Sequence, residues 1–276
     1  MNTAVNAFEL IQSRDISALN LTVEQYRDAT SGAEHIHLKS DNPENVFMVA
    51  LRTVPMNSSG VAHVLEHTAL CGSKKYPVRD PFFMMIRRSL NTFMNAFTSS
   101  DWTAYPFASQ NRKDFNNLLE VYLDAVFFPN LNPLDFAQEG HRLELSEANN
   151  PNSALEIKGI VYNEMKGAMS SPTSTLWQSL SEHLYPTTTY HYNSGGDPEN
   201  IPELTHEQLV DFHKTHYHPS NAIFMTFGNI DAREHQNKFA TVIHSFETKT
   251  DPIRVGLEQR YSKPLVVKGS YALAES

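Results

Sequence analysis

The sequence predicts an α+β fold, in which an antiparallel β-sheet has helices packed mainly on one face. Segments in which apolar residues alternate lie at 19–26, 33–38 and 46–53, and again at 92–99 and 102–108. Segments with helical spacing of apolar residues are grouped between and after these strands. We see no Gly/Ser-rich or Pro-rich linker and no internal repeat, so strands and helices are expected to form one α+β domain.

Composition indicates a folded globular protein and argues against several classes of partner. The chain has 276 residues, of which 40% are hydrophobic and 19% charged, enough to bury a substantial core. Its net charge of −9 disfavours nucleic acid as a partner, because phosphate binding needs a basic face. No apolar run approaches the roughly 18 residues that span a bilayer, so no membrane partner is expected.

Cysteine usage and the N-terminal sequence bear on the compartment. Cys71 is the single cysteine, which excludes an internal disulfide and suits a reducing environment. The first twenty residues lack a basic stretch followed by an apolar one, and they contain Glu9 and Asp15. This argues against a secretory signal and against an intact organellar transit peptide. We therefore expect a cytoplasmic protein, with the mitochondrial or plastid matrix after processing as the alternative.

The individual elements follow from periodicity and from turn and capping residues. A helix is expected at residues 60–70, where Gly72 stops it, and a second helix at 81–90. Thr205 and Gln208 have the spacing of a capping box at the start of another helix. The other expected helices cover 115–127, 157–168, 175–184, 206–217 and 232–246, and further strands 142–145, 222–228 and 265–271.

The stretch His63-Val-Leu-Glu66-His67 has the spacing of a metal site. Residues four apart on a helix share a face, so both imidazoles can reach one metal ion at roughly 2.0–2.1 Å. Glu66 projects towards the same edge, where it can take a proton from metal-bound water. The order is the reverse of the common His-Glu-x-x-His motif. A third ligand must come from elsewhere, and Glu164 is the candidate, although a lone helical glutamate is usually a solvated surface residue.

Several long strings make the resemblance to a known family specific. The motif is followed, 97 residues after His67, by Asn-Glu164-Met-Lys-Gly, and together they resemble the pitrilysin/insulinase family of zinc peptidases. Flanking strings resemble the presequence-protease branch of that family: Leu70-Cys-Gly-Ser-Lys-Lys-Tyr-Pro-Val-Arg-Asp-Pro-Phe-Phe83, Leu90-Asn-Thr-Phe-Met-Asn-Ala-Phe-Thr98, Ser194-Gly-Gly-Asp-Pro198 and His216-Tyr-His-Pro-Ser-Asn-Ala222.

The resemblance implies a metallohydrolase fold like that of mitochondrial processing peptidase and LuxS, with a defined set of site residues. It implies His63, His67 and Glu164 as zinc ligands, Glu66 as the general base, and Asn95, Ala96, Phe97 and Thr98 as the edge strand that holds substrate. Asp101 and Thr103 are candidates to support the site from behind, which the sequence leaves open. Some family members carry a second acid before the liganding glutamate. Here that position is Ile157, and the adjacent Glu156 is expected to face elsewhere on the same helix.

By this resemblance the function is zinc-dependent endopeptidase activity on unstructured peptides such as presequences. Residues 1–246 are expected to form the catalytic domain and 247–276 an extension towards a further domain. The C-terminal half of such enzymes is absent from this chain and is its expected partner, so the isolated chain should bind zinc but cleave peptides poorly. The alternatives are a non-catalytic structural or peptide-binding domain on the same fold, including a module that binds peptides without zinc.

Two other groups are weaker candidates for a site. His206, His213, His216 and His218 are clustered, but no acidic residue has a convincing spacing to them, so a structural role is expected. Cys71 lacks the surroundings of a nucleophile.

Overall fold

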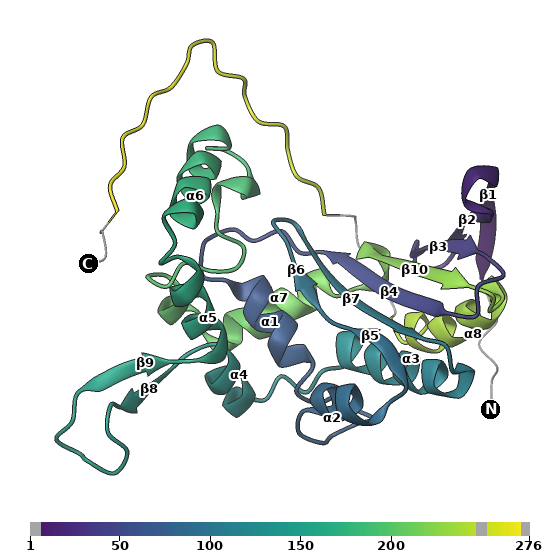
Figure 1. Cartoon of the computed structure of the whole chain (residues 1–276), viewed down its shortest axis with the longest axis horizontal. Helices are drawn as coiled ribbons and strands as arrows, with labels where there is room; N and C mark the ends of the chain where they lie inside the picture. The colour runs from purple at the N-terminus through teal and green to yellow at the C-terminus, as the bar shows by residue number, and fades with distance from the viewer. Residues whose placement is uncertain (1–6, 247–252, 272–276) are drawn as a thin grey trace.

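A mixed sheet forms the centre of the computed structural model, which describes residues 7–246 and 253–271 (Figure 1). The strands run in the order β1-β2-β3-β10-β4-β7-β5, and β6 pairs with β7. Neighbouring strands are antiparallel except β3 and β10, which are parallel, so the sheet is antiparallel with one parallel pair. The strands are β1 Phe8–Ile16, β2 Leu21–Asp28, β3 Glu34–Lys39, β4 Asn45–Arg52, β5 Asn91–Met94, β6 Phe97–Thr98, β7 Trp102–Ser109 and β10 Ala222–Gly228.

The helices lie against one face and one end of this sheet. In Figure 1, α3 and α8 lie under the strands, while α1, α4, α5, α6 and α7 gather at the end where β6 is found. A separate hairpin, β8 Arg142–Leu145 with β9 Leu155–Lys158, projects beside α5. The helices are α1 Val61–Ala69, α2 Pro81–Arg88, α3 Arg112–Phe127, α4 Pro133–Glu139, α5 Ile160–Ala168, α6 Pro172–Leu184, α7 His206–His216 and α8 Ala232–Ile243.

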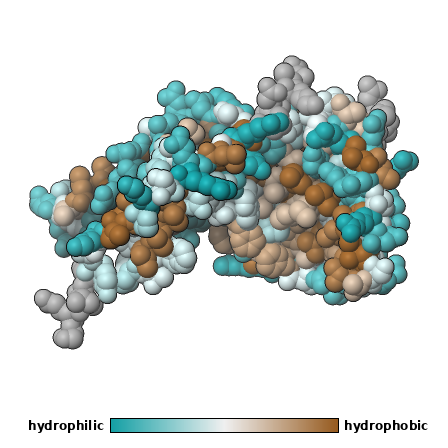
Figure 2. Space-filling view, turned by 90° about the horizontal axis from the view of Figure 1, so that it is seen from above, coloured by the Kyte–Doolittle hydropathy of each residue, from teal (hydrophilic) through white to brown (hydrophobic). Residues whose placement is uncertain are grey.

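The core lies between the sheet and the helices α3 and α8. Side chains alternate between the two faces of a strand, and β4 shows this as a strict alternation of buried and half-buried residues. Phe47 faces Phe107 on the buried side, and Val49 faces Tyr105. On the opposite face of β4, Val46, Met48 and Ala50 are half-buried. Figure 2, viewed from above Figure 1, shows apolar side chains gathered over this part of the molecule.

Most expected elements are confirmed within a few residues, and the α+β class with helices mainly on one face is confirmed. Two expectations are wrong in their extent. The strand expected at 92–99 is interrupted at Asn95 and Ala96, which separate β5 from β6. The helix expected at 157–168 begins only at Ile160, and Ile157 and Glu156 belong to β9 instead.

The strand expected at 265–271 is wrong, because these residues have no regular secondary structure. The first fifty residues were expected to form β structure, but no separate strand was predicted at β1, where most side chains are exposed. The short helix α4 was missed as well; Asn132 caps it by accepting a hydrogen bond from the Leu134 amide.

Residues 1–6, 247–252 and 272–276 lie outside the described part of the chain, and the domain boundary at 246/247 stays a prediction. Within the described part, none of the helices combines the length and apolar character that a membrane crossing requires.

Candidate metal centre

The helix α1 begins at a close approach of two loops. Gly60 precedes the helix with φ 72°, and a Cβ on it would lie 2.8 Å from the Cα of Gly196. Only glycine can adopt this positive φ without strain and also leave room for the backbone of Gly196. The approach brings the backbone carbonyl of Gly195 to the first turn of α1, where Nδ1 of His63 donates a hydrogen bond to it at 2.9 Å.

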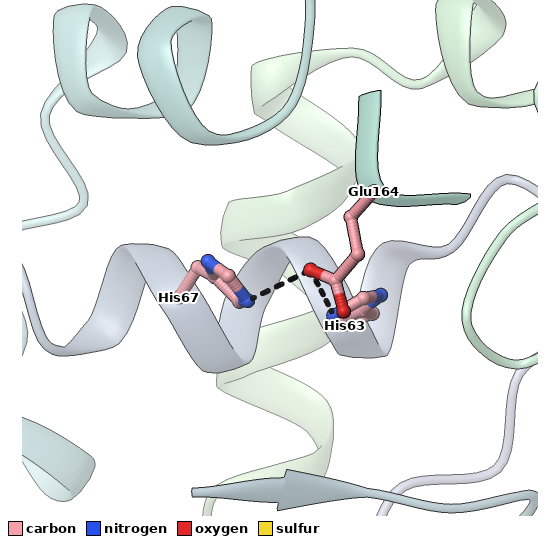
Figure 3. A group of neighbouring side chains, drawn as sticks. All are labelled: His63, His67 and Glu164. Atoms are coloured by element: carbon pink, nitrogen blue, oxygen red, sulfur yellow. Dashed lines mark ion pairs between the residues drawn. The ribbon is translucent and has the colours of Figure 1, made fainter. Parts of the chain in front are cut away.

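His63, His67 and Glu164 come together as the sequence predicts. One possible ligand atom from each lies within 4.8 Å of the other two, and no other such group is found in the described residues. Oε2 of Glu164 lies 3.7 Å from Nε2 of His63 and 4.0 Å from Nε2 of His67. Figure 3 shows Glu164 reaching down from α5 between the two imidazoles, which both come from α1.

Hydrogen bonds behind the imidazoles orient their free nitrogens. A backbone carbonyl only accepts, so Nδ1 of His63 carries the proton and Nε2 keeps its lone pair when the ring is neutral. Nδ1 of His67 likewise donates to Oε2 of Glu139 at 3.1 Å. Both Nε2 atoms face Glu164, and each can offer its lone pair to a metal ion. Two such nitrogens with a carboxylate suit zinc, which takes nitrogen and oxygen ligands and leaves one position for water in catalytic sites.

Glu139 is a site residue that sequence reasoning missed. It is the last residue of α4, is only 5% exposed, and lies 72 residues from His67 along the chain. A carboxylate on the far nitrogen of a liganding histidine fixes the ring and raises its basicity. Sequence reasoning named only Asp101 and Thr103 as possible supporting residues, and no pattern in the sequence pointed to Glu139.

The charges around His67 suit a cation. Burial lowers the pKa of this imidazole, but its hydrogen bond to Glu139 and the charges of Glu66, Glu139 and Glu164 outweigh burial and raise the pKa overall. The same negative surroundings stabilise a bound metal ion when the ring is neutral.

Glu66 is buried beside the two histidines. It is 7% exposed, and its Oε2 accepts a hydrogen bond of 2.5 Å from the hydroxyl of Thr98. The side chain of Thr98 therefore contacts the expected general base, a role that the sequence did not show.

The other three residues of the expected substrate strand lie near by. Asn95 and Ala96 form the break between β5 and β6, and the Asn95 amide donates to the carbonyl of Pro106 at 3.1 Å. Phe97 pairs with Ala104 of β7, and its side chain is 42% exposed. Within the described residues β6 pairs with no strand other than β7, so its other edge is open.

A pocket of about 330 Å³ adjoins the site between α1, α2 and the β5–β6 break. Glu66, His67 and Glu139 form its polar end. Its apolar lining includes Leu70, Phe82, Phe83, Ile86 and Met94. The pocket has the character of a cavity for an apolar side chain directly beside the candidate base.

The histidines of α7 form hydrogen bonds with backbone carbonyl groups. His206 and His213 each hydrogen bond through Nε2 to a carbonyl, of Leu131 and Val126 respectively. Nδ1 of His216 bonds to the Phe212 carbonyl. None of them belongs to a metal-compatible group within the described residues, which agrees with a structural role. The Cys71 thiol is also unsuited to nucleophilic chemistry, since burial raises its pKa.

Two family models match this chain. The family model described as Insulinase (Peptidase family M16) matches residues 52–172, and the one described as Peptidase M16 inactive domain matches residues 203–270. The first interval contains the whole candidate metal group. The chain belongs to the insulinase family of peptidases, family M16.

Curated relatives within that family include presequence proteases. The chain is 49% identical over 262 residues to "Presequence protease, mitochondrial" of Xenopus tropicalis, which covers 95% of this chain and 26% of that protein. It is 44% identical to the protein of the same name from Schizosaccharomyces pombe, over 89% of this chain and 25% of that protein. The chain thus spans about a quarter of the length of these relatives.

Solved structures share the fold. The crystal structure of pitrilysin matches 90% of this chain and 26% of its own with a TM-score of 0.68 and 19% identity. A protease from Helicobacter pylori matches 86% of this chain and 53% of its own with a TM-score of 0.65 and 18% identity.

Proposed function

We propose that this chain is the metal-binding part of a zinc-dependent endopeptidase that hydrolyses unstructured peptides. The observation that carries the proposal is the convergence of His63, His67 and Glu164 with Glu66 buried beside them. The presequence protease relatives support the same reaction and substrate class.

The side chains divide the chemistry between them. His63, His67 and Glu164 would hold the zinc, with Gly195 and Glu139 fixing the two rings from behind. Zinc, when bound, lowers the pKa of a water molecule towards neutrality and polarises a peptide carbonyl. Glu66 would accept the proton from that water and return it to the leaving amine.

The open edge of β6 supports peptide binding without sequence specificity. An extended peptide that adds to this edge would bond to backbone groups of residues 95–98, whatever its own side chains. The adjoining pocket of about 330 Å³ would receive one apolar side chain next to the site. Unstructured peptides such as presequences fit this mode because they can adopt an extended conformation at low cost.

The remaining parts of such an enzyme are proposed from the relatives. Because the chain spans about a quarter of their length, we propose that a C-terminal portion completes the substrate chamber around residues 1–246. The names of the relatives favour a mitochondrial location over a cytoplasmic one for this chain.

A chimera tests the proposal directly. This chain replaces the matching quarter of the Xenopus tropicalis protein, and cleavage of an unstructured fluorogenic peptide is compared with that of the chain alone. We expect zinc-dependent turnover by the chimera and turnover at least about 100-fold lower by the chain alone, because binding and transition-state contacts are divided between the portions. An inactive chimera that folds and holds zinc would instead favour a non-catalytic domain on the same fold.

A further inference from the structure

We propose that Thr98 is a positioning residue for Glu66: its hydroxyl ends a one-way chain of buried hydroxyls and holds one carboxylate oxygen in place. This inference rests on the proposed function, since it assigns Glu66 the role of base. It also changes the role of Thr98, which the family resemblance implied only as part of the substrate strand.

The first link is the contact between Thr98 and Glu66. The Thr98 hydroxyl donates to Oε2 of Glu66 at 2.5 Å, within the short range of hydrogen bonds to a charged acceptor. An ionised carboxylate only accepts, so the single proton of this hydroxyl is committed to Glu66. Among the described residues Oε1 of Glu66 has no hydrogen-bond partner, so it remains the oxygen that can take a proton.

The direction of the other links follows from proton counting. Thr98 lies 3.4 Å, hydroxyl to hydroxyl, from Thr103, and Thr103 lies 2.8 Å from Thr53. Because Thr98 has used its proton, only Thr103 can donate in the contact between them. Thr103 then accepts from Thr53 and from the Tyr217 hydroxyl, which also hydrogen bonds to it. The bonds therefore run Thr53 to Thr103 to Thr98 to Glu66, and each polarises the next in the same sense.

The fold holds this chain rigidly. Thr98 faces Thr103 directly across the β6–β7 pair, and Thr53 follows β4 with its amide bonded to the Asp101 carbonyl at 2.9 Å. Thr53 and Thr103 are fully buried. A β-branched residue at each place limits side-chain rotation, which suits a positioning function.

Two buried tyrosines lie next to the hydroxyl chain, where Tyr217 hydrogen bonds to Thr103. Their hydroxyls, of Tyr105 and Tyr217, lie 2.8 Å apart. Burial raises the pKa of both phenols, and the charge of Glu66 raises them further. Both phenols therefore stay neutral and add no negative charge beside the hydroxyl chain.

Three variants of the chimera distinguish the role of the Thr98 hydroxyl from the role of the β6 backbone. Thr98→Val keeps the β-branched shape and backbone edge but removes the donor, and we expect kcat to fall about 10- to 100-fold with KM within about twofold. Thr98→Ser keeps the donor and should restore most of kcat. Thr92→Val is the matched control, because Thr92 on β5 donates to Glu44, the residue before β4, in an exposed contact. It should leave kcat, KM and the melting temperature unchanged.

A readout without turnover tests the same point. In a crystal structure of the zinc-loaded chain with Thr98→Val, we expect the Glu66 carboxylate to leave the position that Thr98 holds, with zinc content unchanged. A carboxylate that stays in place would overturn the inference, as would Thr98→Ser losing as much kcat as Thr98→Val. In the Glu66→Gln background Thr98→Val should cause no further loss of kcat. If Glu66→Gln itself remained active, the proposed function would fail, and the crystal structure alone would decide the role of Thr98.

Discussion

Replacing Glu66 with glutamine should abolish peptide hydrolysis by the chimera while zinc content stays at that of the unmodified protein. Glutamine has nearly the same shape, and its carbonyl oxygen can still accept the hydrogen bond from Thr98. It cannot accept a proton from water, however, and general-base catalysis contributes about 10²–10⁴-fold to a rate. We therefore expect kcat to fall by about 10³-fold or more, with the melting temperature little changed.

Glu156→Gln is the control for this loss. Glu156 lies on β9, where its side chain is half exposed and 3.9 Å from the ammonium group of Lys158. The same change of charge there should leave kcat within about twofold. Hydrolysis by Glu66→Gln within tenfold of the parent, with zinc bound, would remove Glu66 from the role of base.

Acid should destabilise the chain through three buried histidines far from the metal group. His35, His37 and His235 are at most 2% exposed, and burial lowers the pKa of all three. Burial, helped by the neighbouring His37, lowers that of His235 to about 3. Nε2 of His235 has no hydrogen-bond partner in the described structure, so a proton there would gain no hydrogen bond. The charge of Asp231 and the backbone of Ile230 favour the protonated ring, but burial outweighs them.

Hydrogen bonds also fix the neutral forms of the other two rings. Gln236 donates to Nδ1 of His35 at 3.2 Å, so Nε2 of that ring carries the proton and donates to the Thr226 hydroxyl at 2.8 Å. The Thr226 hydroxyl in turn donates to Nδ1 of His37 at 2.8 Å. A second proton on either ring would turn its accepting Nδ1 into a donor, and the hydrogen bond that this nitrogen accepts would be lost.

The pH window follows from the direction of these shifts. A pKa that is lower in the folded than in the unfolded state contributes stability that is fully present above pH 6.5. That stability is lost as the pH falls towards about 3, because the unfolded state binds the proton first. For His235 alone the loss is on the order of 5 kcal/mol at 1.36 kcal/mol per pH unit, a large part of a typical folding free energy.

Chemical denaturation between pH 7 and pH 4 measures this effect. Carboxylates also titrate in this range, so the informative quantity is the difference between the parent chain and His235→Leu. We expect the variant to lose less stability on acidification, while His183→Leu on α6 should follow the parent. Identical pH dependence of His235→Leu and the parent would show that His235 does not carry the acid sensitivity.

The sequence predicted the parts of the fold and site that local periodicity encodes. The spacing of His63 and His67 on one helix, and the alternation along β4 and β7, are local signals. The resemblance supplied Glu164, because 97 residues separate it from His67 and no local pattern links them. The structure brings it within 3.7 Å of His63 by packing α5 over α1.

What the sequence missed depends on contacts between distant elements. Glu139 reaches His67 from α4, a helix of seven residues that is too short to show a period. The side-chain role of Thr98 depends on α1 packing against β6, and strand alternation says nothing of that contact. Residues 265–271 have apolar residues but no partner strand among the described residues, so apolar content alone did not make them a strand.

Zinc analysis of the purified chain, with single-residue variants, tests the central claim most directly. His67→Ala removes one ligand, while His183→Ala removes a histidine of α6 that lies outside the metal group. The account predicts one zinc per chain in the parent and in His183→Ala, and a loss of affinity in His67→Ala large enough to leave it metal-free after dialysis. A parent chain that folds without binding zinc, or His67→Ala with a full complement of zinc, would contradict it.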